Sequence, residues 1–211
     1  MGSHRDTLES GRQEQLGQPS GWIFDKEVST PGSGFLSSDS ILMVNSWGSR
    51  AATWVGPAYY KRLDPPLNLR DESFTLEVNL AASRPCVGTL YFQFLDADDR
   101  VIVEAGVSGA GATNRPNAGW DDFYIWNQND YQGQNIRQTV GDPCGALRGV
   151  LAVRNEHGAY SLLFNGGRKV SSSLHDLVMA TRLRMGIQYY APDGEPSLDG
   201  VKLQWLRLTR P

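Results

Sequence analysis

The sequence predicts an all-β fold, a two-sheet antiparallel jelly-roll sandwich with one short helix. In segment after segment, apolar and polar residues alternate with period two, which is typical of strands with one buried face. Turn-forming residues separate these segments, and the 211 residues include 23 Gly and 11 Pro. Because each expected strand has a single apolar face, two sheets must pack against each other to bury those faces.

Order is expected to begin at Trp22. Residues 1–20 have no periodic apolar pattern and end in Gly17-Gln18-Pro19-Ser20, which is typical of a disordered tail, tag or linker. Residues 21–211 then form the β-sandwich domain, and a chain of this length suits one such domain.

The alternation is clearest at residues 74–80, where the apolar side chains fall on every second position. Residues 89–94 and 101–106 alternate in the same way, and the polar stretch 96–100 between them predicts a hairpin. Only Leu174–Ala180 has helical character. Further strands are expected at Asp122–Asn127, Gln134–Val140, Gly149–Asn155, Ala159–Phe164, Arg168–Ser172, Arg182–Tyr189 and Val201–Leu208.

Charge and cysteine usage exclude several classes of partner. The net charge is -3 and the pI is about 5.6, so no field of the whole chain would attract nucleic acid. No run approaches the ~18 apolar residues of a membrane span. Cys86 and Cys144 could form one disulfide or remain two free thiols, and no Cys/His cluster has zinc spacing.

The C-terminal half carries a family resemblance. The stretch from Leu151 to Val170, with its strand, turn, second strand and Asn-Gly, resembles a recurring part of concanavalin A-like (laminin G-like) sandwiches. The closing stretch from Leu198 to Leu206 resembles the last strand of that superfamily. Lectins, carbohydrate-binding modules, glycanases, lyases and adhesion domains share this fold. The resemblance therefore implies a jelly roll without choosing among these functions.

The faces of the middle strands opposite the core carry the candidate site. Aromatic rings pack on the C–H face of a sugar, and arginine, amide and carboxylate groups bind its hydroxyls, so this mixture is typical of a saccharide site. The same residues could instead be an ordinary solvated face or be covered by loops. The expected ligand-binding residues are Tyr91, Gln93, Tyr124, Trp126, Arg184, Gln188 and Tyr190, with Trp54 from a second, loop-borne aromatic group that includes Trp47, Tyr59 and Tyr60.

Catalysis on the same face is the main alternative. Glycoside hydrolysis needs two carboxylates beside the scissile bond, and the Glu-x-Asp-x-Glu strand of the family's glucanases is missing here. Glu77, Glu104 and Asp122 would have to converge from different strands. The family's polysaccharide lyases use Tyr, His, Arg and Gln, and Arg184, Gln188 and Tyr190 resemble that set.

Two oxygen-rich positions in the sequence could bind a structural calcium ion, and no other cofactor is expected. In several jelly-roll carbohydrate-binding modules, an Asp just before the last strand ligates calcium, and Asp199 matches that place. The hairpin carboxylates at 96–99 are a second oxygen-rich position, although such turns favour Asp in any case.

The preferred interpretation is a non-catalytic carbohydrate-binding or surface-recognition domain that binds an oligo- or polysaccharide on an aromatic-lined concave sheet. Its expected location is extracellular or at the cell surface, with other domains of a larger protein as further partners. The alternatives are a polysaccharide lyase or glycoside hydrolase, and a structural or adhesion domain of a cell-surface or phage-tail assembly.

Overall fold

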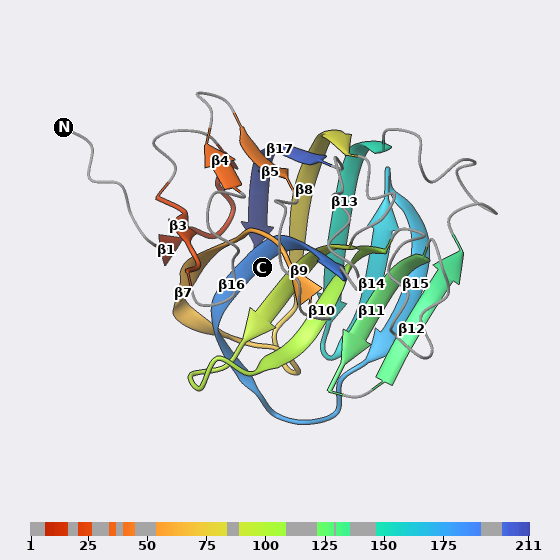
Figure 1. Ribbon diagram of the computed structural model, residues 1–211. Coiled ribbons are helices and arrows are strands. Elements are labelled where there is room, and N and C mark those ends of the chain that lie inside the picture. Colours follow the sequence, from red (N-terminus) through yellow and green to blue (C-terminus); the bar gives the residue numbers. More distant parts are fainter. Residues whose placement is uncertain are drawn as a thin grey trace.

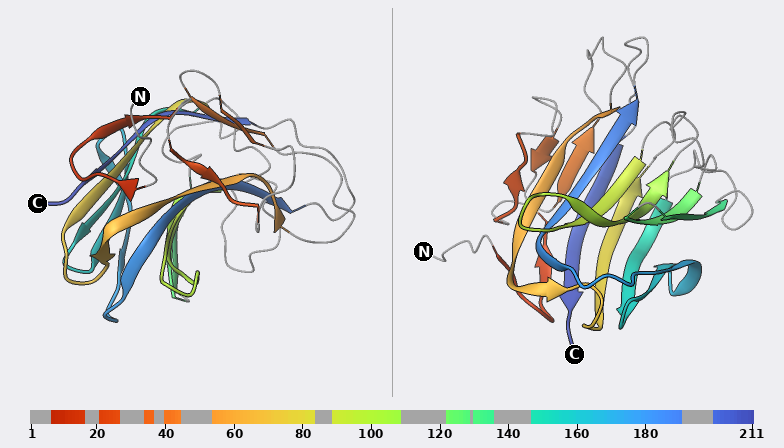
Figure 2. Two further views of the ribbon diagram at one scale, coloured as in Figure 1. Left: turned by 90° about the vertical axis from the view of Figure 1, so that its left-hand side faces the viewer. Right: turned by 90° about the horizontal axis from the view of Figure 1, so that it is seen from below.

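The computed structural model describes residues 7–16, 21–26, 34–36, 40–44, 54–83, 89–108, 122–128, 130–135, 147–190 and 200–211. These residues form two large, mostly antiparallel sheets that pack face to face (Figure 1). The sheets curve in the same direction, and one lies inside the arch of the other (Figure 2). We call the inner, nine-stranded sheet the concave sheet and the outer, eight-stranded sheet the convex sheet. The predicted two-sheet sandwich is confirmed.

The concave sheet has the strand order β1-β7-β16-β9-β10-β11-β12, with β3 added beside β7 and β6 beside β16. Its strands are β1 (Thr7–Leu8), β3 (Ile23–Phe24), β6 (Trp54–Val55), β7 (Ala58–Asn68), β9 (Thr89–Leu95), β10 (Val101–Ser108), β11 (Asp122–Asn127), β12 (Asp130–Asn135) and β16 (Met179–Tyr190).

The convex sheet has the order β15-β14-β13-β8-β17-β5-β4, with β2 beside β17. Its strands are β2 (Gln13–Gln15), β4 (Gly34–Leu36), β5 (Ile41–Val44), β8 (Phe74–Ser83), β13 (Leu147–Glu156), β14 (Ala159–Phe164), β15 (Gly167–Ser173) and β17 (Gly200–Thr209).

The core lies between the sheets and is built from the apolar positions of the alternating pattern. Phe74 of the convex sheet meets Phe94 of the concave sheet with ring centroids 5.2 Å apart, and Phe123 meets Phe164 at 5.4 Å. All four side chains are buried. Every second residue of the central strands is thereby fixed toward the core, so the residues between them point outward.

The helix expected at Leu174–Ala180 is absent, and no α-helix occurs in the described part of the chain. This segment carries the chain from β15 of the convex sheet to β16 of the concave sheet. Its backbone bonds to neighbouring segments instead of to itself: Leu174 N donates to Gly158 O, and Val178 O accepts from Leu69 N. The need to cross between sheets overrides the local helical pattern.

The expectation that order begins at Trp22 is wrong for residues 7–16. β1 pairs in parallel with β7, and β2 pairs in antiparallel fashion with β17. Leu8 and Leu16 are buried in the core, at 2% and 0% exposure. Two such isolated apolar residues are too few to give a periodic signal, yet their burial is enough to dock the segment.

Two further expectations are corrected. Of the strand expected at Gln134–Val140, residues 136–140 lie outside the described residues, and the described strand begins earlier, at Asp130, because β11 turns back directly into a hairpin with β12 and Trp126 pairs with Tyr131. Tyr59 and Tyr60 are not loop-borne but lie in β7, a strand that contains Pro65 and Pro66. These prolines fall where the β7–β16 register shifts, and Pro65 and Pro66 are exposed, so the sheet does not need their missing N–H groups.

Candidate functional site

The outward side of the concave sheet carries a row of polar and aromatic residues at one level. The register aligns Tyr60 with Arg184, Arg184 with Gln93, Gln93 with Glu104, Glu104 with Trp126 and Trp126 with Tyr131. Their chain neighbours Leu183, Phe92 and Val103 belong to the core cluster. The row therefore points away from the core, across six adjacent strands.

The centre of this row is one hydrogen-bonded chain, which we call the polar chain: Asp25, Arg184, Gln93, Glu104 and Tyr124. Arg184 Nε donates to Asp25 Oδ2 at 2.8 Å, and its Nη1 donates to Gln93 Oε1 at 3.2 Å. Gln93 Nε2 then donates to Glu104 Oε2 at 2.8 Å. The hydroxyl of Tyr124 donates to the other Glu104 oxygen at 2.6 Å.

The polar chain is almost inaccessible to solvent. Arg184 and Gln93 are each 8% exposed, Asp25 and Glu104 are each 6% exposed, and Tyr124 is fully buried. Charged groups are stable at such burial only when each is paired and hydrogen-bonded, as they are here. The polar chain thus presents fixed, preoriented groups rather than mobile surface charges.

A second row, next to the first, alternates glycine with tyrosine. Gly186, Tyr91, Gly106, Tyr124 and Gly133 face one another in register. A Cβ atom at Gly186 would overlap the Tyr91 hydroxyl, and one at Gly133 would come within 2.8 Å of the Tyr131 ring. The glycines therefore leave the space in which the tyrosine rings lie over the sheet.

Both tyrosines of this row are buried. Tyr91 is 5% exposed, and burial, followed by the nearby charge of Glu104, raises its pKa. Tyr124 stacks on Tyr131 with ring centroids 5.7 Å apart and an interplanar angle of 15°. In this structure neither Tyr91 nor Tyr124 offers a free ring face to a ligand.

Partly exposed aromatic rings stand at both ends of the polar chain. Tyr60 lies at one end, where Arg182 lies 5.3 Å from its ring centroid and also binds Asp99 Oδ1 at 2.6 Å. Trp126 and Tyr131 lie at the other end, and both are partly exposed. Three strands separate β7 from β11. The two aromatic ends are therefore about 19 Å apart at the usual spacing between strands.

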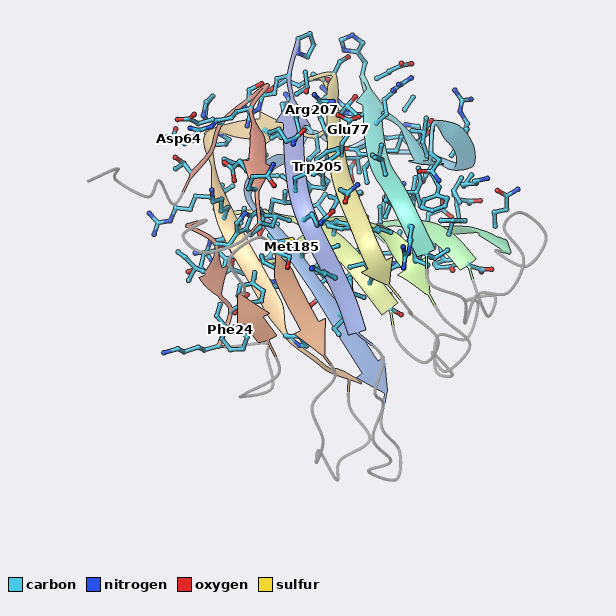
Figure 3. The ribbon with its side chains drawn as sticks, turned by 90° about the horizontal axis from the view of Figure 1, so that it is seen from above. Phe24, Asp64, Glu77, Met185, Trp205 and Arg207 are labelled. Carbon is cyan, nitrogen blue, oxygen red and sulfur yellow. The ribbon has the colours of Figure 1, made fainter. Side chains whose placement is uncertain are left out.

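The structure brings together seven of the residues expected from the sequence and separates one. Glu77 lies in β8 of the convex sheet, where its Oε2 binds Arg207 Nη2 at 2.6 Å, so it cannot join Glu104 (Figure 3). The seven residues that share the outward side of the concave sheet are Tyr91, Gln93, Glu104, Asp122, Tyr124, Trp126 and Arg184. Asp122 Oδ2 accepts a hydrogen bond from the Tyr131 hydroxyl at 3.2 Å.

The remaining expected residues are placed only in part. The backbone of Gln188 pairs with Thr89 and that of Tyr190 with Trp54, so all three expected residues adjoin this region, but their side chains lie outside the described residues. Asp199, Trp47 and both cysteines also lie outside the described residues.

Three residues of the site are placed differently from what the sequence predicts, or are not predicted at all. Asp25 follows the two-residue strand β3, and its N–H donates to Ala58 O, which places its carboxylate beside Arg184. Tyr60 is expected in a loop and lies in β7, and Tyr131 precedes the strand expected at Gln134–Val140 and lies in β12. Pairing of Tyr131 with Trp126 follows from a tight hairpin, and the short stretch Asn127-Gln128-Asn129-Asp130 is a turn signal for one.

The described residues contain no group of three His, Cys, Asp or Glu side chains that could hold a metal ion. In the 96–99 hairpin, Asp96 Oδ1 instead accepts the N–H groups of Asp98 and Arg100, and Asp99 binds Arg182. No helix long and apolar enough to span a membrane occurs in the same part of the chain.

Comparison with known proteins identifies the fold. No protein-family model matches the sequence, and no curated protein sequence matches it. Solved structures do match. A Bacillus licheniformis beta-glucanase has a TM-score of 0.67 at 10% identity, covering 96% of this chain and 99% of that one.

Two other solved structures extend the likeness. An alginate lyase of polysaccharide lyase family 7 has a TM-score of 0.59 at 11% identity, covering 94% of both chains. The Emp47p carbohydrate recognition domain has a TM-score of 0.59 at 11% identity, covering 99% of both chains. The two-sheet architecture and these likenesses together show that the chain has the concanavalin A-like jelly-roll fold.

Proposed function

We propose that this domain binds an extracellular oligo- or polysaccharide on the concave sheet, without cleaving it. The observation that carries the proposal is the polar chain, held rigid between the partly exposed rings of Tyr60 at one end and Trp126 and Tyr131 at the other. An extended row of this kind matches a linear ligand with apolar ring faces and hydroxyl groups. The glucanase, lyase and carbohydrate recognition domain of similar fold support this class of ligand.

The exposed rings would make the first contacts. Trp126 and Tyr60 would stack on the C–H faces of separate sugar residues, and Arg182 would bind hydroxyl or carboxylate oxygens beside Tyr60. Tyr91 and Tyr124 would act beneath them as buried supports that fix Glu104 and Gln93. Gln188, Tyr190 and Trp54 would extend the surface along β16 and β6.

Titration calorimetry with soluble neutral and uronate oligosaccharides tests the proposal. Binding at millimolar concentration or tighter is expected for at least one of them. Trp126→Ala should weaken it about tenfold, or ~1.4 kcal/mol, because one stacking contact is lost. Arg12→Ala is the matched control, since this side chain is exposed and its ion pair within the described residues is with Glu9. Absence of binding by the unaltered protein to every oligosaccharide would refute the proposal.

A polysaccharide lyase or glycoside hydrolase on the same face is the second candidate. It is favoured by the 2.6 Å hydrogen bond between Tyr124 and Glu104, because a tyrosine beside a carboxylate is a proton-transfer pair. Incubation with uronate polymers and neutral glucans, with the release of unsaturated or reducing ends as the readout, separates the two functions. Turnover that Glu104→Gln abolishes would establish the enzyme and overturn the non-catalytic proposal.

A further inference from the structure

Two arginines stand directly opposite each other near one end of the polar chain. The register pairs Arg62 of β7 with Arg182 of β16, two positions along β7 from Tyr60. Lys61 and Leu183, the next residues of the two strands, are buried, so both arginines point to the outward side of the concave sheet. Directly opposed residues have Cβ atoms about 5 Å apart, and like charges at such positions destabilise a sheet.

The two guanidinium groups differ in how their charges are neutralised. Arg182 donates from Nη1 to Asp99 Oδ1 at 2.6 Å, and its guanidinium lies 5.3 Å from the ring centroid of Tyr60. The Arg182 side chain is still 34% exposed, and a guanidinium has further N–H donors beside the one that Asp99 accepts. Arg62 is exposed and makes no ion pair within the described part of the chain. The arginine pair therefore carries one positive charge more than its surroundings neutralise.

An apolar surface lies beside the arginine pair. Tyr60 is partly exposed and pairs in register with Ile23 of β3, whose side chain is 37% exposed. Partners in register point to the same side of a sheet, so Ile23 and Tyr60 share the outward side with Arg62. Two positions along a strand span about 7 Å. A ligand that fits here combines an apolar ring face with an anionic substituent, and an acidic sugar has both.

The other end of the row carries the opposite charge. Glu104 of β10 and Asp122 of β11 are buried on the outward side, and Glu104 accepts two hydrogen bonds, which suits an ionised carboxylate. At the β7 end, by contrast, the carboxylate of Asp25 is matched by Arg184, and the charge of Arg62 is left over. The concave sheet therefore attracts an anionic group at its β7 end and repels one at its β11 end.

We propose that Arg62 and Arg182 bind the carboxylate or sulfate group of an acidic sugar whose ring lies on Tyr60 and Ile23. The planar guanidinium fork matches such a group with two parallel N–H···O bonds. The ligand of the concave sheet is then a polysaccharide with an acidic residue, and this residue occupies the β7 end. This assignment rests on the binding function proposed for the concave sheet, to which it adds the ligand class.

Titration calorimetry with three tetrasaccharides tests the arginine pair. Xylotetraose is the neutral probe, aldotetraouronic acid has three xyloses and one glucuronate, and a carrageenan tetrasaccharide carries sulfate. At least one acidic probe should bind about tenfold tighter than xylotetraose, or ~1.4 kcal/mol, and Arg62→Gln should abolish this preference. Arg62→Lys keeps the charge without the fork and should retain part of it. Arg154→Gln removes the same charge from an exposed position on the convex sheet and should leave the preference unchanged.

The outcomes separate this assignment from the function on which it rests. If xylotetraose binds as tightly as both acidic probes, the domain binds saccharides and the acidic ligand is overturned. An acidic preference that survives Arg62→Gln overturns the arginine pair as its cause. A preference for one acidic probe that Arg62→Gln abolishes supports the pair and identifies its anion as carboxylate or sulfate. No binding of any oligosaccharide, longer ones included, overturns the proposed function and this assignment together. Thermal unfolding midpoints check that the variants fold.

Discussion

Lys61 of the concave sheet and Glu14 of the convex sheet form an ion pair inside the edge of the sandwich. Nζ of Lys61 lies 2.7 Å from Glu14 Oε2, and the two side chains are only 3% and 12% exposed. The ammonium group also lies 5.8 Å from the ring centroid of Trp22. The pair attaches the N-terminal strand β2 to the opposite sheet, so each partner depends on the other for its charge to be tolerated.

Removing one partner of this pair should destabilise the fold strongly. Lys61→Met leaves the Glu14 carboxylate buried without its cation, and we expect a loss of about 3–5 kcal/mol in the free energy of unfolding. Denaturant titration measures it. The double variant Lys61→Met/Glu14→Leu removes both charges and should recover most of the loss. A single variant as stable as the unaltered chain would mean that β2 is not docked.

Replacing the arginine of the polar chain by an uncharged residue should lower the free energy of unfolding. Arg184→Met keeps most of the side-chain volume but takes the arginine away from the buried carboxylate of Asp25, so unfolding should become easier by about 3–5 kcal/mol. Arg154→Met is the control, because Arg154 is exposed on the convex sheet and should change stability by less than about 0.5 kcal/mol. Equal effects of the two substitutions would contradict the burial of the polar chain.

Close contact between Tyr91 and Gly186 predicts a steric effect. In Gly186→Ala, the new methyl group meets the Tyr91 hydroxyl and lies 2.8 Å from Pro57 O, so overpacking should destabilise the protein by about 1–3 kcal/mol. Gly167→Ala is matched in size, but its nearest neighbour is Phe164 O at 3.5 Å. Thermal unfolding midpoints of both variants measure the difference, and a tolerated alanine at 186 would place the Tyr91 ring elsewhere.

Alkaline pH should distinguish buried tyrosines from exposed ones. Burial raises the pKa of Tyr59, Tyr91 and Tyr160, so in the folded protein these three stay neutral at about pH 10, where free tyrosine ionises. Below the pKa of tyrosine in the unfolded chain, these side chains are neutral in both states, so their contribution to stability is fully present and does not change with pH. Above it, the unfolded chain loses these protons first, so stability falls as pH rises. Tyrosinate absorbance of the folded and denaturant-unfolded protein measures the difference, and identical titrations would refute it.

The sequence predicted which side of each strand faces the core. It did not predict which strands are neighbours or how deeply the outward residues are buried. Clean alternation put Gln93, Glu104 and Arg184 on the correct side of their strands. For the three strands that carry these residues, however, the sequence predicted one pairing, through the hairpin between β9 and β10. The position of β16 beside β9 depends on contacts between residues distant in sequence. Glu77 was misplaced for the same reason, because the chain changes sheet between β8 and β9. Alternation with period two determines which face of a strand is buried, but it does not determine to which sheet the strand belongs.

The register slip between β17 and β8, where Gln204 and Trp205 stand against Asn79, has a signal in the sequence. Apolar residues fall at Val201 and Leu203 and then at Leu206 and Leu208, so the period slips by one residue between the two pairs. A slip of this kind indicates an extra residue in the strand. The burial of Tyr91 and Tyr124 had no equivalent signal, because it depends on contacts between strands, such as the stacking of Tyr124 on Tyr131, which no local pattern encodes.

Residues near the two ends of the described chain meet at the end of β17. Ser10 bridges to Leu208, Gly11 N donates to Leu208 O at 2.6 Å, and Arg210 N donates to Ser10 Oγ at 2.9 Å. A covalent partner on either side would therefore attach at almost the same point. Sequences joined to the two ends would thus both meet the domain beside β17.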